Sequence, residues 1–265
     1  MVLVRAGVGR RRARNGMLLC ALVCLVVQLP TFTAPGDRHG GSKVVRRAAQ
    51  KDAEGFQGFG LHGAALTASS AVLGPALDGT AHGNFGVLAY HFPPPVPVML
   101  GSYKLFSTAI WVPPLFAFAG LLISSLYWLI DNALAVKAEQ RSPSLLQTLA
   151  AVMCFAANYW ASGFMSSNDL GTGKTVQRLI SCVLALWAIS AWRVFDGTTT
   201  GLVVSVMTAV GGTLIEVFLI NAPWWDLYAY SKADFWGVDS WIPWVYFCGA
   251  PAVGNLSRLI RNRLA

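Results

Sequence analysis

Long stretches without a charged residue are the feature that most limits what this chain can fold into. Leu105–Ile130, Leu145–Met165 and Ser240–Ser257 contain no charge, and Gly197–Trp225 contains only Glu216. A helix of about 20 predominantly apolar residues spans a bilayer. These four stretches therefore predict membrane-spanning helices.

Two weaker stretches complete the predicted bundle. Leu179–Trp192 is shorter, but Arg178 and Arg193 flank it, and their long side chains can reach the membrane interface. Gly58–Leu77 is rich in Gly, Ala and Ser, which suit close helix packing in lipid. The sequence thus predicts an all-α integral membrane protein built as a six-transmembrane-helix bundle.

The predicted chain has two parts. Residues 1–57 are expected to form a signal or targeting leader, and residues 58–265 a six-helix membrane domain. Residues 78–104, which include four prolines, form the longest connection and are expected to lie along a membrane interface.

Composition and charge exclude several classes of protein. The chain is 55% hydrophobic and only 12% charged, about half the charge of a soluble domain, so an ordinary cytosolic enzyme is excluded. The net charge of +8 resides in the leader, because residues 1–51 hold ten of the twenty Lys and Arg residues and one of the twelve acids. A nucleic-acid surface needs basic residues clustered on the folded domain, and none is predicted.

The leader has the pattern of a targeting sequence. Four arginines between residues 10 and 14 precede an apolar run, Met17–Leu29, as in a secretory signal peptide. The element Phe32-Thr-Ala-Pro35 and the basic, acid-poor segment after it resemble the bipartite presequences of algae with complex plastids. We expect cleavage after residue 31; an uncleaved signal anchor is the alternative.

Charge also bears on orientation. In the six-helix arrangement, the side with both mature termini collects six Lys and Arg residues, against four on the other side. This bias favours termini in the cytosol or stroma. A cleaved secretory signal would instead leave the mature N-terminus in the lumen, so the two interpretations conflict unless the chain is re-imported or keeps its leader.

Motifs of soluble chemistry are incomplete. Gly171-Thr-Gly-Lys-Thr175 resembles the end of a phosphate-binding loop, but Asn168 occupies the place of the first glycine. The cysteines form no CxxC pair, and His62, His82 and His91 do not follow the spacing of a recurrent metal site. We predict no enzyme activity, no metal and no cofactor.

Two acidic residues within or beside the apolar stretches are candidate functional residues. Glu216 lies near the middle of its stretch, where an ionised carboxylate is costly, so we expect it to be protonated or hydrogen-bonded to Asn158 or Asn221. Asp196 precedes a run of threonines. There it can cap the following helix or act as a functional group.

Several motifs resemble the Insig (insulin-induced gene protein) family. Ser240–Arg258 resembles the last helix of that family, and Trp111-Val-Pro-Pro114 resembles a motif of its second helix. Leu126–Asp131, Phe195-Asp196 and Thr213–Ile215 resemble further family segments in the same order, so the resemblance covers about residues 105–258. The residues in register that carry the structural motif are Trp111, Pro113, Pro114, Trp241, Pro243, Gly254, Asn255 and Arg258.

The resemblance implies a non-enzymatic membrane protein that binds a sterol or other lipid and contacts a membrane-protein partner. It implies lipid-binding roles for Trp192 and Gln177 and a partner-binding role for Asp196. Glu216 is a further lipid-binding candidate because it is an acid within an apolar stretch. The pocket glutamine of the family is less well matched, because Leu179 occupies the position in register and Gln177 lies two residues farther from Trp192. Glu216 replaces an uncharged residue.

The expected location is the endoplasmic reticulum membrane, which the family implies, or a complex-plastid membrane, which the leader indicates. A homo-oligomer is a further candidate assembly. Two other functions stay open: a structural or assembly component of a plastid membrane, and a transporter centred on Glu216. A transporter would be expected to show internal repeats, and none is visible in the sequence.

Overall fold

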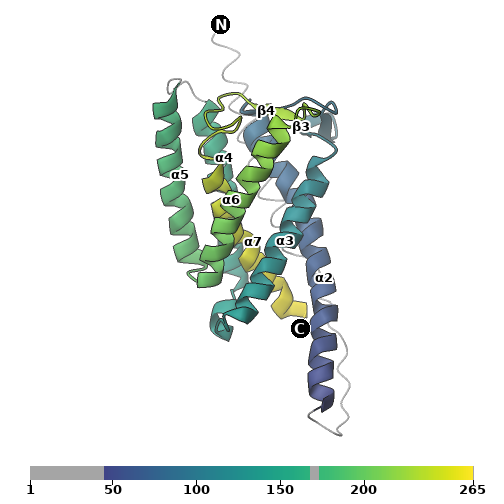
Figure 1. Ribbon diagram of the computed structural model, residues 1–265. Coiled ribbons are helices and arrows are strands. Elements are labelled where there is room, and N and C mark those ends of the chain that lie inside the picture. Colours follow the sequence, from purple (N-terminus) through teal and green to yellow (C-terminus); the bar gives the residue numbers. More distant parts are fainter. Residues whose placement is uncertain (1–44, 168–172, 265) are drawn as a thin grey trace.

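The structure is a computed structural model of the chain, and it describes residues 45–167 and 173–264. The expectations for the leader ahead of residue 45, and for Gly171, lie outside these residues. Figure 1 shows helices that run side by side and alternate in direction. We call the end at which α2, α4 and α6 terminate the upper end, and the opposite end the lower end.

The described residues form six long helices. They are α2 (Val45–Leu77), α3 (Val112–Ala133), α4 (Leu145–Ser167), α5 (Lys174–Phe195), α6 (Thr199–Asn221) and α7 (Ile242–Leu264). Three of the helices in this part of the chain are long and apolar enough to cross a membrane: α3, α5 and α6.

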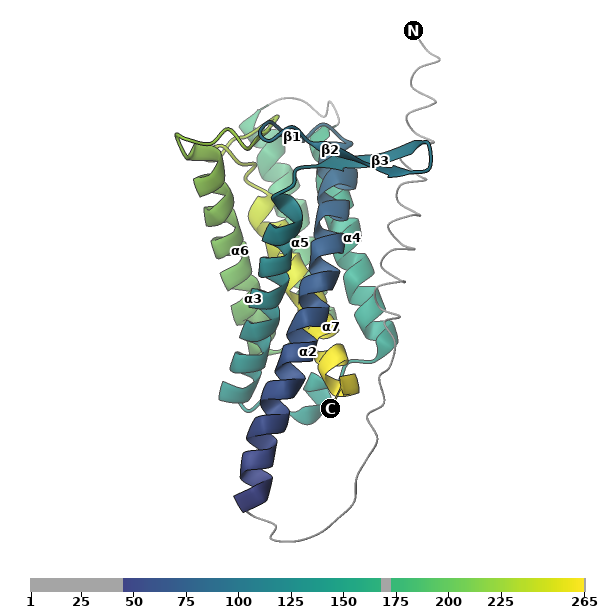
Figure 2. The ribbon, with the colours of Figure 1, turned by 90° about the vertical axis from the view of Figure 1, so that its right-hand side faces the viewer.

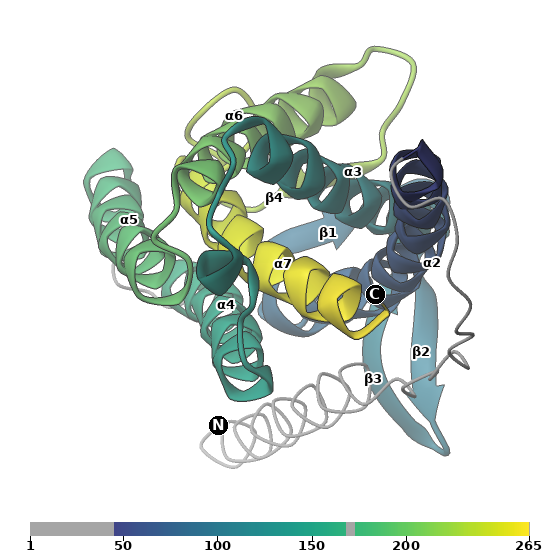
Figure 3. The ribbon, with the colours of Figure 1, turned by 90° about the horizontal axis from the view of Figure 1, so that it is seen from below.

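Helix α7 lies in the centre of the bundle. Seen from below, the other helices surround it (Figure 3), and it packs against all five of them. Its buried residues include Ala250 and the polar Asn255 and Arg258, and Trp241, just before the helix, is buried as well. Helix α7 can carry these polar residues because they face the interior of the protein.

The helix boundaries differ from the predicted ones for local reasons. Helix α3 begins at Val112 and not at Leu105, because residues 103–108 form β3 and because Pro113 and Pro114 are well accommodated in the first turn of a helix. Helix α6 begins after Thr198, whose hydroxyl oxygen accepts a hydrogen bond from the amide of Gly201 as an N-cap.

Helix α2 is longer at its start than expected. It begins at Val45, so residues 45–57, which we assigned to the leader, continue the helix predicted over Gly58–Leu77. Helix α5 likewise extends beyond the predicted Leu179–Trp192 at both ends.

The fold is mostly helical, as predicted, and short additional elements lie near its two ends. A π-helix, η1 (Asp78–Gly83), follows α2, and a 3-10 helix, η2 (Ala138–Arg141), follows α3 at the lower end. Strand β1 (Leu88–Tyr90) pairs antiparallel with β4 (Tyr228–Tyr230), and β2 (Val96–Leu100) pairs with β3 (Tyr103–Thr108) as a hairpin. Figure 2 shows the β2–β3 hairpin projecting sideways from the bundle. Short apolar segments flanked by glycine and proline formed strands where the sequence predicted an irregular connection and the start of a helix.

Candidate functional site

A buried ion-pair cluster lies near the lower end of the bundle and is centred on Arg258 of α7. The guanidinium donates to both carboxylate oxygens of Asp131 on α3, with Nε–Oδ2 2.9 Å and Nη2–Oδ1 2.7 Å. Its Nη1 lies 3.2 Å from Oδ1 of Asp196, which follows α5. Both aspartate side chains are fully buried. Arg258 thus joins α3, α7 and the turn between α5 and α6.

Asp196 has several further partners inside the protein. The Tyr127 hydroxyl donates to its Oδ2 at 2.7 Å, and the Thr198 amide donates to its Oδ1 at 3.1 Å. The Thr198 hydroxyl also donates to Oδ1. The N-cap of α6 is therefore Thr198, and Asp196 holds that cap in place instead of capping the helix itself.

The charges of this cluster nearly balance. Two carboxylates, Asp131 and Asp196, face Arg258, and the Arg261 guanidinium lies 3.6 Å from Asp131. The Arg258 guanidinium also lies 4.9 Å from the centre of the Tyr127 ring, a cation–π distance. Removing one partner of a buried ion pair costs about 3–5 kcal/mol, because the other charge stays buried and unpaired.

Other motif residues converge on the same turn. The Asn255 amide donates to the carbonyl of Phe195 at 3.0 Å, and the Trp192 indole donates to the carbonyl of Thr198 at 3.2 Å. A Cβ on Gly254 would lie 2.1 Å from the Tyr127 ring, so only glycine allows α7 and α3 to approach this closely. Ala250, one turn before Gly254 on α7, is fully buried in a hydrophobic cluster with Tyr127.

Glu216 has different partners from those we expected. Its carboxylate accepts hydrogen bonds from the hydroxyls of Tyr230, at 2.6 Å, and of Tyr246. Asn221 instead donates to the carbonyls of Val217 and Trp236. Asn158 is fully buried, and its amide has no hydrogen-bond partner among the described residues.

A second carboxylate, that of Asp78, lies near the upper end of the bundle, as Glu216 does. It accepts hydrogen bonds from Tyr159, at 2.8 Å, and from Tyr90, and it lies 3.4 Å from Nδ1 of His82. His82 in turn contacts the Ser162 hydroxyl at 2.9 Å. The upper end of the bundle therefore holds two carboxylates surrounded by tyrosine hydroxyls.

The three histidines of the described residues do not form one site. His62 contacts the hydroxyl of Ser257, His82 belongs to the Asp78 group, and His91 lies 2.6 Å from Asp226. Over residues 45–167 and 173–264, no group of three or more His, Cys, Asp or Glu side chains could hold a metal ion.

Asp239, in the connection before α7, is the third buried carboxyl near the upper end. It is fully buried, and neither of its oxygens has a hydrogen-bond partner among the described residues. The pKa of Asp239 is raised to about 7, mainly by burial and also by the negative charges of Asp234 and Glu216, against a smaller opposite effect of Lys232.

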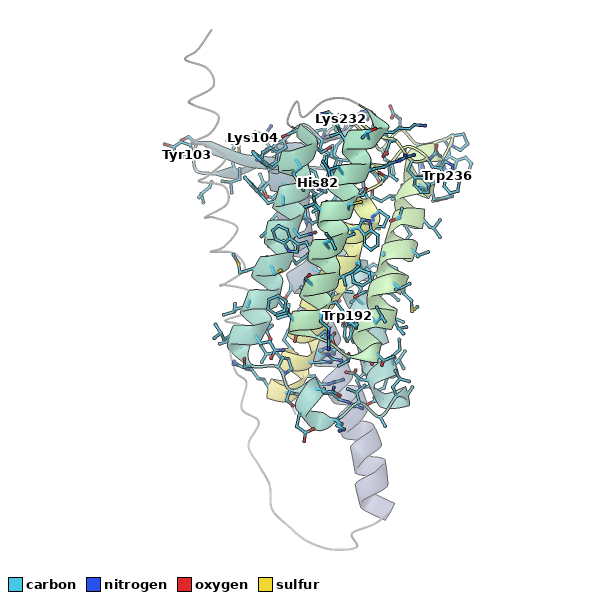
Figure 4. The ribbon with its side chains drawn as sticks, turned by 90° about the vertical axis from the view of Figure 1, so that its left-hand side faces the viewer. His82, Tyr103, Lys104, Trp192, Lys232 and Trp236 are labelled. Carbon is cyan, nitrogen blue, oxygen red and sulfur yellow. The ribbon has the colours of Figure 1, made fainter. Side chains whose placement is uncertain are left out.

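Gln177 and Trp192, two of the three residues with predicted lipid-binding roles, lie near opposite ends of α5. Gln177 lies in the first turns of α5, is buried, and has a carbonyl oxygen without a partner among the described residues. Trp192 lies fifteen residues farther along the same helix, so about 22 Å separates them along the axis. Figure 4 shows Trp192 near the lower end and His82 near the upper end.

Sequence reasoning missed the tyrosines. Tyr90, Tyr159, Tyr230 and Tyr246 come from four different elements, and their pairing with Asp78 and Glu216 has no local signature. The only signal was the burial expected of an acid in an apolar stretch, because a buried carboxylate needs donors. The partnership of Asp131 with Arg258 was likewise invisible, although both residues belonged to recognised motifs.

Comparisons with known proteins identify a family that the chain resembles. The family model described as insulin-induced protein (INSIG) matches residues 83–261. The insulin-induced gene 1 proteins of Gallus gallus and Homo sapiens are each 31% identical over 156 residues, or 58% of this chain. The matched segment covers 57% and 52% of those proteins, so the match spans about half the length of these relatives.

Solved structures show the same fold. The crystal structure of MvINS, a mycobacterial Insig homolog from Mycobacterium vanbaalenii, superposes with a TM-score of 0.58 at 20% identity, covering 76% of this chain and 94% of that chain. A cross-linked trimer of the same mycobacterial protein gives a TM-score of 0.53 at 21% identity, covering 80% and 95%.

Proposed function

Because the chain belongs to the INSIG family of membrane regulatory proteins, we propose that it binds a sterol or related lipid and regulates a membrane-protein partner through helix contacts, without catalysing a reaction. The observation that carries this proposal is the family match over residues 83–261, which includes α3 to α6 and nearly all of α7. The bound lipid would be its only ligand, with no cofactor.

We infer that all six helices span the membrane. Helices α3, α5 and α6 have the required length and apolar composition. Helices α2, α4 and α7 are of similar or greater length and run alongside them in alternating direction. Several polar side chains of α4 and α7 are buried, among them Asn158 and Arg258, and a polar group turned inward does not meet the lipid.

The proposed lipid lies along α5. Gln177 and Trp192 are fifteen residues apart, which places them within about 60° of each other around the helix. An elongated lipid parallel to α5 would therefore meet Gln177 near one end and Trp192 near the other. The unpartnered oxygen of Gln177 is a hydrogen-bond acceptor for a lipid hydroxyl. Glu216 would contribute to the polar end of this site.

Asp196 would support partner binding indirectly. Its carboxylate is buried and bonded to Arg258, Tyr127 and Thr198. A partner touching the lower end would contact the turn between α5 and α6, whose shape these bonds hold. In this proposal, the charged carboxylate of Asp196 holds the turn between α5 and α6 in shape, and the partner binds to that turn.

The proposed location is the endoplasmic reticulum membrane or a complex-plastid membrane reached through it. A homo-oligomer is a compatible assembly, since the mycobacterial relative has been crystallised as a cross-linked trimer.

Mass spectrometry of lipids retained on the detergent-purified chain tests the ligand. We expect a retained lipid with a hydroxyl-bearing polar end, and Gln177→Leu should release it while the protein stays folded, with the melting temperature of the delipidated parent chain. The matched control is Leu179→Ala, because Leu179 is 65% exposed on the same helix. If no lipid is retained above the level of an unrelated membrane protein, the chain is better described as a structural component of its membrane.

Affinity purification from the native cells tests the partner. Asp196→Asn should lose a membrane protein that the unmodified chain retains. The exposed Arg193→Gln, two residues before the end of α5, should keep it. Transport of a solute into vesicles that depends on Glu216 would support the transporter alternative instead.

A further inference from the structure

We propose that the β2–β3 hairpin lies in the interfacial region of the bilayer, with its tip among the lipid headgroups and the first carbons of the acyl chains. The inference rests on the proposed function in one respect, since it requires the helices to span a membrane. It adds a contact surface, and the chemistry of its partner is that of a phospholipid interface.

The tip of the hairpin is apolar and exposed. Strands β2 and β3 meet at the pair Leu100 and Tyr103, and the hairpin projects beyond the outline of the bundle (Figure 2). The exposed fractions are 56% for Val96, 50% for Met99, 54% for Leu100 and 59% for Tyr103. Residues 92–103 contain no charge, and Lys104 follows them. Exposed apolar side chains gathered in this way indicate an interaction surface.

The base of the hairpin fixes where the tip lies. Phe106 on β3 is buried against η1, so closely that a Cβ on Gly79 would lie 2.4 Å from its ring. Beyond this base, the described residues form only a two-stranded ribbon, and an isolated two-stranded hairpin is at best marginally stable in water. The tip therefore needs a second environment, and its position is set by the packing of Phe106.

A second group of exposed aromatic residues marks the same level on the opposite edge. Trp224 and Trp236, in the connection between α6 and α7, are 66% and 67% exposed. Figure 4 shows Tyr103 with Lys104 on one edge and Trp236 on the other, at similar heights. Trp and Tyr concentrate at membrane interfaces, and lysines extend from there towards water. The two groups define one interfacial plane.

The helices below this plane are suited to lipid. Ile110 just before α3 is 73% exposed, and Phe118 within α3 is 58% exposed. Helix α3 has 22 residues, so it extends about 33 Å, close to the hydrocarbon thickness of about 30 Å. The hairpin thus lies where the apolar part of the bilayer ends.

Strand pairing with another chain fits the hairpin less well. Pro97 lies within β2 and three prolines precede the strand, so this edge has few N–H donors for an added strand. Strand β3 carries Lys104, and a lysine on an edge strand disfavours pairing between edges. At the level of the headgroups, water and polar headgroups can bond to the unpaired backbone groups of the strand edges, and the apolar side chains can contact the acyl chains.

Photo-crosslinking of the full-length chain tests the proposal. A benzophenone amino acid replaces one residue at a time, and each variant is reconstituted in vesicles of phosphatidylcholine and phosphatidylglycerol. The test position is Leu100. Phe118 on α3 is the lipid reference, and Gln140 in the exposed η2 turn at the lower end is the water reference. Mass spectrometry after irradiation measures the fraction of each variant that carries a lipid adduct.

We expect Leu100 to give a lipid-adduct yield near that of Phe118 and several-fold above that of Gln140. A yield at Leu100 equal to that of Gln140, or adducts to a second copy or to another segment of the same chain, would overturn the proposal. If Phe118 itself gave no lipid adduct, the membrane-spanning assignment would fail together with it. Failure at Leu100 alone would leave that assignment intact.

Discussion

At the scale of single residues, the cluster around Arg258 concentrates the strongest interactions of the lower end. The Arg258 guanidinium pairs with the fully buried carboxylates of Asp131 and Asp196. A planar guanidinium can bind a carboxylate through two parallel hydrogen bonds. The cluster therefore depends more on Arg258 than on either acid.

Replacing Arg258 by Gln should destabilise the protein by about 3–5 kcal/mol, because Asp131 and Asp196 would stay buried without their main cation. Thermal unfolding in detergent measures the loss. Arg263→Gln is the control, since Arg263 is exposed near the end of α7 and a surface substitution changes stability by no more than about 0.5 kcal/mol. Equal melting temperatures of the two variants would contradict the structural role of the cluster.

The two aspartates should rank in a defined order. Asp131→Asn should cost more stability than Asp196→Asn, because Asp131 receives two bonds from Arg258 and also lies near Arg261. Asn at position 196 can still accept a hydrogen bond from the Thr198 amide, as Asp196 does. Urea or thermal unfolding of both single variants under one condition decides the order, and the reverse order would show that the Thr198 contact matters more than the ion pairs.

Asp239 should make stability depend on pH. Its folded pKa, about 7, lies above its ordinary value of 3.8, so between these values the unfolded chain releases a proton that the folded chain keeps. Stability should therefore fall as pH rises from about 4 to about 7 and level off above. Asp239→Asn removes this ionisation, so the difference in melting temperature between the variant and the parent chain should grow over that range. A difference that stays constant with pH would contradict the raised pKa.

At the scale of elements, α7 organises the bundle because it touches every other long helix of the described residues. Its small residues set how near those helices come. Gly254 faces the Tyr127 ring of α3, which also bonds to Asp196, so the spacing of two helices and the ion-pair cluster depend on one position.

Gly254→Leu should destabilise the protein strongly, since its side chain would overlap the Tyr127 ring, and overpacking costs typically about 1–3 kcal/mol or more. Val253→Leu is the matched control, because Val253 is only partly buried on another face of α7. Melting temperatures in the same detergent compare them. If Val253→Leu were as damaging as Gly254→Leu, close approach at Gly254 would not explain the effect.

At the scale of the whole molecule, the alternation of helices predicts on which side of the membrane each connection lies. Helices α4, α5 and α6 separate Gln140 from Ser231, and both residues are exposed. If all three helices span, the two positions lie on opposite sides.

Single cysteines introduced at Gln140 and at Ser231 should react with a membrane-impermeant maleimide from opposite sides of sealed vesicles. Labelling before and after permeabilisation measures this. The result tests α4 in particular, because α4 is not among the helices apolar enough to cross by composition alone. Labelling of both positions from the same side would show that an even number of the three helices spans, so that at least one of them does not.

The sequence by itself determined most of the helical plan. Each of the six stretches marked in the sequence overlaps one of the six long helices of the described residues, and three of these helices are long and apolar enough to cross a membrane. Apolar composition is a property of each stretch and needs no partner. The sequence did not predict the beginnings of α3 and α6. Helix α3 begins with prolines in its first turn, and α6 begins after Thr198, whose hydroxyl oxygen accepts a hydrogen bond from the Gly201 amide. Motif residues such as Asn255 and Arg258 indicated the family before the fold was known.

Tertiary structure alone decided which polar groups meet. Glu216 pairs with Tyr230 and Tyr246, and Arg258 pairs with Asp131, a residue 127 positions away in the chain. Periodicity and composition describe neighbours along the chain, whereas a buried charge is satisfied by whatever donor packing brings within reach. The sequence predicted that Asp196 caps a helix or acts as a functional group. Only the packing of α3, α7 and the α5–α6 turn placed its carboxylate inside the protein.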